Sequence, residues 1–127
     1  MLDEEYILDS LNQIKRALNI IMLRSEKVNN VENFTHSQEG MLLLDALCMN
    51  LIALGESVKG LDKITNGELL PKYKDVYWAG VMRMRDKIAH HYFDVDPDMV
   101  FQTIKEDVPQ MLDVVTKMIN DMFISEN

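Results

Sequence analysis

Large apolar residues recur along this chain at steps of three and four, the spacing that gathers them on one face of an α-helix. The clearest run is Ile7, Leu11, Ile14, Leu18 and Ile21. No window shows the strict apolar–polar alternation that is typical of a β-strand. Four amphipathic segments with short connections predict an all-α protein, a helical bundle. A chain of 127 residues is expected to form one domain.

Turn and capping residues predict where the first two helices begin and end. The first helix is expected from Asp3 to Lys27, followed by a polar loop over Asn29–Thr35. Thr35 and Gln38 have the spacing of a capping box, which predicts the start of the second helix. That helix is expected to reach about Lys59, with Gly60 opening a connector. Its predicted apolar face comprises Leu44, Leu47, Leu51, Leu54 and Val58.

The second half of the chain predicts two further helices. The third is expected from about Asp75 to His91, after a connector with a short helical turn at Glu68–Tyr73. The motif Asp96-Pro97-Asp98 predicts the start of the fourth, because it combines a capping carboxylate with a proline at the first helical position. Pro109 is expected to kink that helix. The predicted apolar residues are Trp78, Val81, Met82, Ile88 and Ala89 in the third helix, and Met99, Ile104, Val108, Met111, Leu112, Val115, Met118, Ile119 and Met122 in the fourth.

Several apolar residues fall outside these stripes and raise the question of self-association. They are Ile20, Met22, Met41 and Phe123. Such residues are compatible with a broad core, and equally with a homodimer in which helices pack across the interface. The pattern leaves both readings open.

Composition places the chain among reduced, non-membrane proteins. Its one cysteine, Cys48, cannot form an internal disulfide, which fits a reducing compartment. The opening residues Met1–Glu5 are acidic, where a signal peptide would be basic. The longest apolar stretch, from Met41 to Leu54, is interrupted by polar residues and falls short of the ~20 residues that span a bilayer. We therefore expect a cytoplasmic protein with no membrane contact.

The charge of the chain is unevenly distributed. The net charge is −8, which repels nucleic acid overall. Between Lys59 and His91, however, seven cations and four acids give a net charge of +3. A locally basic segment suits a phosphate ligand, although a solvated helix face has the same composition.

The segment Arg85–Tyr92 is where polar chemistry interrupts the apolar pattern. Arg85 lies three residues from both Met82 and Ile88, on the side of the core stripe. A guanidinium there requires an acidic partner, such as Glu56, or a cleft that receives an anion. On a continuous helix Tyr92 would lie within ~20° of Arg85, whereas His90 would lie ~140° away. Convergence of Arg85 and His90 therefore requires the helix to end near His90, or a second subunit.

Other chemistries are weakly supported. His90, His91, Asp94 and Asp96 are close in sequence, and His36 is also available. Adjacent histidines point to different sides of a helix, however, and no pair of ligands has the spacing of a zinc motif. Cys48 lies on an apolar helix face and is expected to be core rather than a nucleophile. The sequence predicts neither a metal nor any other cofactor.

From Leu42 to about Asp113 the chain resembles the HEPN superfamily, and within it the HepT-like ribonuclease toxins. Four matches carry the resemblance: Leu54-Gly55-Glu56-Ser57, Trp78 seven residues before the arginine, Arg-x-x-x-x-His-x-Tyr at Arg85–Tyr92 with the following Phe93, and Val108-Pro109 with Met111-Leu112. The chain departs from the family pattern at Tyr77, Arg83 and Asp86, where a proline, a small residue and an asparagine are common. An acid at Asp86 is able to pair with Arg85 and weaken anion binding.

The resemblance implies a HEPN-like, up-and-down bundle of four main helices, a homodimer, and metal-independent cleavage of RNA in a cleft between subunits. Arg85 and His90 are implied as catalytic, with Asp86, His91 and Glu56 as supporting residues. The residue types suit this chemistry. A histidine exchanges protons near neutral pH, and a guanidinium grips the phosphate on which charge develops. The implied product is a 2′,3′-cyclic phosphate, and single-stranded RNA is the expected substrate.

The resemblance also implies a partner, a minimal nucleotidyltransferase antitoxin that adds AMP groups to the motif tyrosine, here Tyr92. Added phosphates would bring negative charge to Arg85 and block the cleft. The main alternative is a binding module without turnover, in which the same cleft holds a nucleotide or the nucleotidyltransferase. The acidic body favours that alternative, because it holds RNA poorly. A purely structural oligomer is the third possibility.

Overall fold

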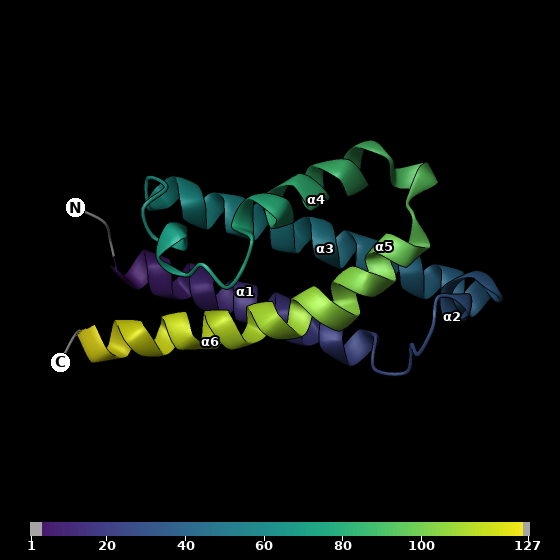
Figure 1. The fold of residues 1–127 in the computed structure, drawn as a ribbon, viewed down its shortest axis with the longest axis horizontal. Helices are drawn as coiled ribbons and strands as arrows, with labels where there is room; N and C mark the ends of the chain where they lie inside the picture. The colour runs from purple at the N-terminus through teal and green to yellow at the C-terminus, as the bar shows by residue number, and fades with distance from the viewer. Residues whose placement is uncertain (1–3, 126–127) are drawn as a thin grey trace.

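The computed structural model describes residues 4–125, apart from the side chains of Tyr92 and Ser125, and is helical throughout (Figure 1). Its four long helices are α1 (Glu4–Arg24), α3 (Gln38–Ile64), α4 (Trp78–His90) and α6 (Val108–Ser125). Successive long helices run in opposite directions, and both termini lie at one end of the molecule. The predicted all-α, up-and-down architecture is confirmed. The predicted start of the first helix at Asp3 lies outside the described residues.

Short helical elements connect the long helices. They are α2 (Glu32–Thr35), the 3-10 turns η1 (Leu70–Lys72) and η2 (Tyr92–Asp94), α5 (Pro97–Gln102) and the π-helical turn η3 (Thr103–Asp107). Helix α3 is central, since it packs against α1, α2 and α4, while α6 lies along α1.

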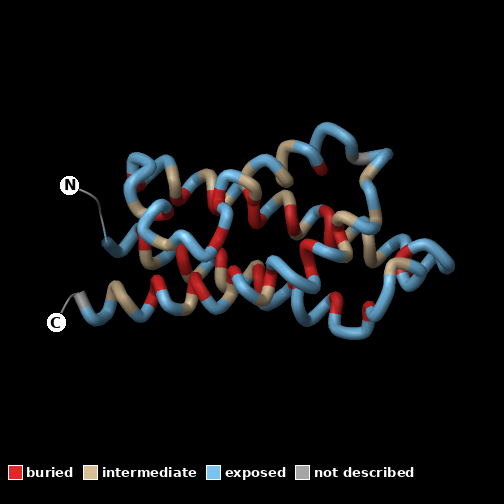
Figure 2. The backbone as a smooth tube through the Cα atoms, viewed as in Figure 1, coloured by how far each residue is buried: buried red, intermediate tan, exposed pale blue. Residues whose placement is uncertain are grey.

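The core forms where the apolar stripes meet, and Figure 2 shows the buried residues on the facing sides of the helices. The α1 stripe is buried as predicted, as are four of the five predicted residues of α3. Leu44, the fifth, is half-buried near the start of α3. In α4 the prediction of Ala89 as a core residue is wrong, because Ala89 is exposed next to the helix end. Ile20, Met22, Met41 and Phe123, which the pattern left open between a broad core and a dimer interface, are all exposed.

Two predicted boundaries of the second helix are wrong. Ser37, not Thr35, caps α3, because the Ser37 Oγ accepts from the Gly40 backbone N–H at 2.9 Å while Thr35 is the last residue of α2. Gly60 does not open a connector but lies inside α3, which continues to Ile64. The buried residues Val58 and Leu61 keep the apolar stripe running past the glycine, and their burial offsets its low helix propensity.

The predicted start of the last helical segment is confirmed, but its kink takes another form. The Asp96 carboxylate accepts from the Asp98 N–H at 2.9 Å, and Pro97 opens α5. Proline at 109 has no N–H for the Lys105 carbonyl, and its ring crowds that carbonyl. The backbone accommodates the proline by forming the wide π turn Thr103–Asp107 immediately before α6.

Among residues 4–125, α3 is the one helix long and apolar enough to cross a membrane, judged by length and composition. About a third of its apolar window, 33%, is buried within the protein. Core helices of soluble proteins satisfy the same test, so this is weak evidence for a membrane span.

Candidate active site

Helix α4 carries the predicted site residues and is anchored at its start. The Trp78 indole N–H donates to the Tyr73 carbonyl at 2.9 Å, which ties the helix to the preceding connector. Val81 and Ile88 are buried on the side that faces the core. These contacts fix the rotation of α4 and therefore the direction in which Arg85 points.

Helices α3 and α4 approach most closely where Gly55 meets Arg85. A Cβ atom built on Gly55 would lie 2.2 Å from the Arg85 Cβ and 2.8 Å from its Cγ. No residue with a side chain fits at position 55 unless the helices separate. The absence of a side chain at Gly55 thus allows the Arg85 stem to lie directly on α3, with its guanidinium beside the next residue, Glu56.

Arg85 is held by carboxylates from both helices. Its Nε lies 2.6 Å from the Glu56 Oε1, and its Nη1 donates to the Asp86 Oδ1 at 3.0 Å. The Nε is buried, and its contact with Glu56 is close but lacks the orientation of a hydrogen bond. The Arg85 side chain remains 26% exposed and that of Glu56 54%. Of the two possibilities open at the sequence level, an acidic partner for Arg85 is therefore present, while part of the guanidinium still reaches solvent.

A second cation completes this network. Lys59, one turn after Gly55 on α3, donates to the same Asp86 Oδ1 at 2.7 Å. The hydrogen bonds from Lys59 and then Arg85 lower the pKa of the Asp86 carboxyl. We name Glu56, Lys59, Arg85 and Asp86 the α3–α4 charge cluster; it brings two positive charges together at the surface.

His90 stands apart from this cluster. It is the last residue of α4 and is exposed, and the exposed His91 caps the helix through its backbone N–H to the Lys87 carbonyl at 3.0 Å. The helix ends within one residue of the predicted His91, whereas it begins at Trp78 and not at Asp75. Because α4 is regular from Arg85 to His90, the two side chains diverge by ~140° within one chain. No hydrogen bond or ion pair joins them among residues 4–125, and the side chain of Tyr92 lies outside the described part of the structure.

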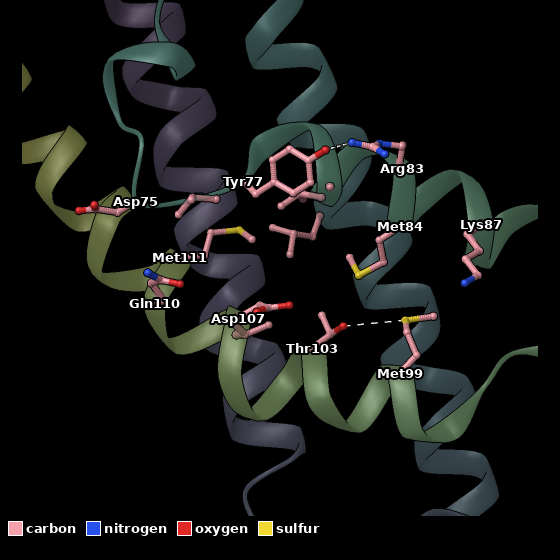
Figure 3. Close-up of a pocket in the computed structure, with 15 residues that line it drawn as sticks. Asp75, Tyr77, Arg83, Met84, Lys87, Met99, Thr103, Asp107, Gln110 and Met111 are labelled. Atoms are coloured by element: carbon pink, nitrogen blue, oxygen red, sulfur yellow. Dashed lines mark hydrogen bonds between the residues drawn. The ribbon is translucent and has the colours of Figure 1, made fainter.

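An open groove of about 520 Å³ borders the opposite side of α4 (Figure 3). Its walls come from α4 with the segment before it, from α5, η3 and the start of α6, and from Leu54 of α3. Met84, Met99 and Met111 provide much of the apolar surface, and Arg83 and Lys87 lie along one edge. A smaller hollow of about 220 Å³ adjoins His91 and Asp94. Arg85 and His90 line neither cavity.

The alternative chemistries find little support in the geometry. No group of three or more His, Cys, Asp or Glu side chains is arranged to hold a metal ion within the described residues. Cys48 is buried in α3 as predicted, and burial, with the nearby Asp45 charge, raises the pKa of its thiol to about 11. A thiol with this pKa is a poor nucleophile at neutral pH.

Comparison with known families matches residues 7–118 to the model described as Ribonuclease HepT-like. The chain belongs to this family. The match covers α3 and α4 completely and most of α1 and α6, and it includes Arg85, His90 and Tyr92. HepT-like membership and the helical bundle confirm the HEPN-like fold inferred from the sequence.

Individual relatives of this HepT-like chain are archaeal and bacterial. A protein of Caldanaerobacter subterraneus subsp. tengcongensis named "Putative RNase" is 31% identical over 68% of this chain and 72% of its own length. A protein of Thermococcus cleftensis named "Probable ribonuclease HepT" is 28% identical over 68% of this chain and 81% of its own. No solved structure matches the chain.

Two further relatives come from Methanocaldococcus jannaschii. One, named "Putative RNase", is 31% identical over 61% of this HepT-like chain and 60% of its own length. The other, named "Gamma-glutamylcyclotransferase and putative RNase", is 25% identical over 92% of this chain. This chain spans about half, 49%, of that relative, and less than two thirds of the first.

Three features of the site were missed at the sequence level. Gly55 and Glu56 were noted in a family stretch, but the contact between Gly55 and Arg85 was not foreseen. Lys59 counted only toward the basic window. The groove had no sequence signal, because its walls come from positions as distant as Leu54 and Met111.

Proposed function

We propose that this protein is an endoribonuclease toxin that cleaves RNA without a metal ion, with Arg85 and His90 in the chemistry. The observation that carries the proposal is the match to the Ribonuclease HepT-like family over residues 7–118, which include both side chains. Relatives whose printed names are those of RNases add support. The substrate is RNA in the cytoplasm, with single-stranded regions favoured because their backbone is accessible.

The proposed reaction is attack by an RNA 2′-hydroxyl on the adjacent phosphorus. A neutral His90 accepts the 2′-hydroxyl proton as the new P–O bond forms. A second, protonated histidine donates a proton to the 5′-oxygen as the old P–O bond breaks. The products are a 2′,3′-cyclic phosphate and a 5′-hydroxyl, and each turnover leaves the two histidines with exchanged protonation states. Arg85 stabilises the negative charge that develops on the phosphorane oxygens.

This chemistry requires two histidines and a nearby arginine, which one chain does not bring together. We propose a homodimer in which two copies of α4 supply both. An apolar strip on α3 supports this arrangement: Leu42 and Met49 are 68% and 55% exposed, on the same helix that carries Glu56. Pairing two copies along this strip would bury apolar surface next to both charge clusters.

The carboxylates around Arg85 impose a condition on substrate binding. Phosphate must displace Glu56 or Asp86 from the guanidinium, or bind its remaining N–H groups. Glu56 is the more readily displaced, since its side chain is half exposed and its contact lacks hydrogen-bond geometry. His91, beside the catalytic residue and exposed, is a supporting residue at most.

Regulation by a minimal nucleotidyltransferase antitoxin is part of the proposal. AMP groups on Tyr92, two residues beyond His90, would carry negative charge to the cleft and repel RNA. Full neutralisation of a Tyr92→Phe variant by the partner, through modification elsewhere, would exclude this route.

The test is an RNA cleavage assay in EDTA with analysis of product ends. Wild type should leave 2′,3′-cyclic phosphates, while Arg85→Ala and His90→Ala should each lose at least about a hundredfold in rate. Arg16→Ala and His36→Ala change exposed residues of the same types elsewhere and should cleave normally. The mass of the wild-type protein must be measured first, because AMP groups on Tyr92 would also silence it.

If unmodified wild-type protein cleaves no RNA, a nucleotide- or nucleotidyltransferase-binding module is favoured instead. The net charge of −8 and the carboxylates on Arg85 favour this second function. Such a module would bind nucleotide through the cleft, lose affinity in Arg85→Ala, and cleave nothing.

A further inference from the structure

The groove on the other side of α4 has opposite charges on its two edges. Arg83 and Lys87, one turn apart on α4, form a positive edge. Asp107 lies across the groove, and in Figure 3 its carboxylate points toward the interior. Apolar side chains, Met84 and Met99 among them, lie between the two edges. A ligand that fits this lining is anionic at one end, flat and apolar in the middle, and rich in N–H groups at the other end.

Asp107 is poised for such a ligand. It makes no hydrogen bond or ion pair with any described residue. Partial burial, together with the neighbouring Glu106 charge, raises the pKa of its carboxyl. A partly desolvated carboxylate without a partner gains more from an N–H donor than a fully hydrated one does.

The backbone that presents Asp107 is also unusual. Thr103 and Asp107 are the first and last residues of the π turn η3, and both line the groove. Pro109 gives a local reason for this turn. The position of the turn in the groove wall also supports a binding site, since π turns inside helices occur frequently at functional sites. The turn places two polar side chains of one segment in the groove lining, which also includes Gln110 and Asp75.

An aromatic side chain closes the top of the groove. Tyr77 is 68% exposed, and Gly80 lies so close that a Cβ there would meet its ring at 2.6 Å. The Arg83 guanidinium lies 5.2 Å from the centre of the Tyr77 ring and donates to its hydroxyl. The ring is thereby held as a flat, exposed surface at the mouth.

We propose that this groove binds one nucleotide of the RNA substrate, with the base against the methionines and Tyr77, its amino edge at Asp107, and a phosphate at Arg83 and Lys87. The volume, about 520 Å³, lies in the range of pockets that bind small ligands. Guanine is the favoured base, because its N1–H and N2–H groups can bond both oxygens of one carboxylate. Adenine and cytosine offer one amino group, and uracil offers none.

This inference rests on the proposed function, since it assigns a base-binding subsite beside the reaction centre. The groove and the α3–α4 charge cluster lie on different sides of one helix, so a bound strand would cross α4 between them. Arg83 and Lys87 alternate with Arg85 along the helix and would guide the backbone across it.

Methionine methyl groups provide a direct test. In full-length protein labelled with ¹³C at methionine methyls, the signals of Met84, Met99 and Met111 report on the groove. Met118, buried in α6 outside the groove lining, serves as the internal control. Titration with 5′-GMP should shift the groove signals, and 5′-UMP should bind about tenfold more weakly, as expected for lost charge-assisted hydrogen bonds.

Matched variants locate the interaction. Asp107→Asn should weaken GMP binding about tenfold and leave UMP binding unchanged. Glu106→Gln removes the same charge from the adjacent residue, which does not line the groove, and should bind GMP as wild type does. Lys87→Gln should weaken both nucleotides equally.

Four outcomes decide the inference. Selective groove shifts with loss in Asp107→Asn support it. Equal affinity for GMP and UMP, a shift of Met118 without shifts of the groove methionines, or no shift at millimolar nucleotide overturn it. The titration is then repeated with tetranucleotides that contain or lack guanosine. A site for an RNA strand should bind the guanosine-containing tetranucleotide more tightly than GMP, whereas a mononucleotide site should not. If nucleotides bind in the groove but the protein cleaves no RNA, the ribonuclease proposal fails and the base-binding proposal stands. If the protein cleaves RNA but nucleotides do not bind in the groove, the base-binding proposal fails and the ribonuclease proposal stands.

Discussion

The two sides of α4 differ in how closely the rest of the protein approaches them. On the α3 side there is no room for a single carbon atom at Gly55, and the Arg85 guanidinium is held between two carboxylates. On the other side a groove of about 520 Å³ remains open, and its Asp107 and Lys87 contact no described charged partner. Close packing on the α3 side holds the Arg85 guanidinium in position. The open groove on the other side leaves room for a ligand. One helix can thus serve chemistry on one side and base recognition on the other.

The largest expected effect on stability comes from adding a side chain at Gly55, where α3 and α4 approach most closely. In Gly55→Ala the new methyl group would collide with the Arg85 stem, so the helices must separate. We expect a loss of about 2–3 kcal/mol in unfolding free energy, measured by urea denaturation.

Gly60→Ala is the matched control on the same helix. Nothing lies within 4 Å of its added Cβ, and the residue is exposed inside α3. Alanine should therefore stabilise the protein by about 0.5–1 kcal/mol. Equal effects at the two glycines would contradict the close approach at Arg85.

A smaller stability effect is expected on the open side. In Gly80→Ala the new Cβ would meet only the side chain of Tyr77, which can swing toward solvent. Unfolding free energy should change by less than about 1 kcal/mol, while GMP affinity falls several-fold as the ring moves. A variant that loses as much stability as Gly55→Ala would show that this side is packed as tightly.

The smallest predicted effect concerns pH and the α3–α4 charge cluster. Because hydrogen bonds from Lys59 and Arg85 lower the Asp86 pKa, the ionised form is favoured in the folded protein. Its stabilisation is present above the unfolded-state pKa of ~3.9 and is lost as pH falls through the folded value. The stability difference between wild type and Asp86→Asn, measured from pH 7 to pH 2.5, should therefore shrink toward the acid end. A constant difference would mean that Asp86 contributes through packing rather than charge.

The sequence predicts most of the fold because apolar residues at helical spacing specify which faces meet. It misplaces the cap of α3 because Thr35 and Ser37 both have capping side chains, and only the turn of α2 decides between them. Gly60 was interpreted as a breaker because glycine disfavours helices locally, whereas burial of Val58 and Leu61 keeps this helix intact.

The candidate site is only partly predictable for a related reason. Arg85, His90 and the pairing with Glu56 or Asp86 follow from local spacing and from the family pattern. The contact with Gly55 and the groove depend on how closely whole helices approach, which a linear pattern does not encode. The π turn that orients Asp107 arises from Pro109, where the sequence predicts only a kink.

The most direct measurement of this division of labour is the set of cleavage positions on an RNA of mixed sequence, read by sequencing product ends. The account predicts that wild type cleaves beside guanosine, that Arg85→Ala loses at least about a hundredfold in rate, and that Asp107→Asn loses the guanosine preference while Glu106→Gln keeps it. Wild-type cleavage by Arg85→Ala, or an unchanged preference in Asp107→Asn, would contradict it.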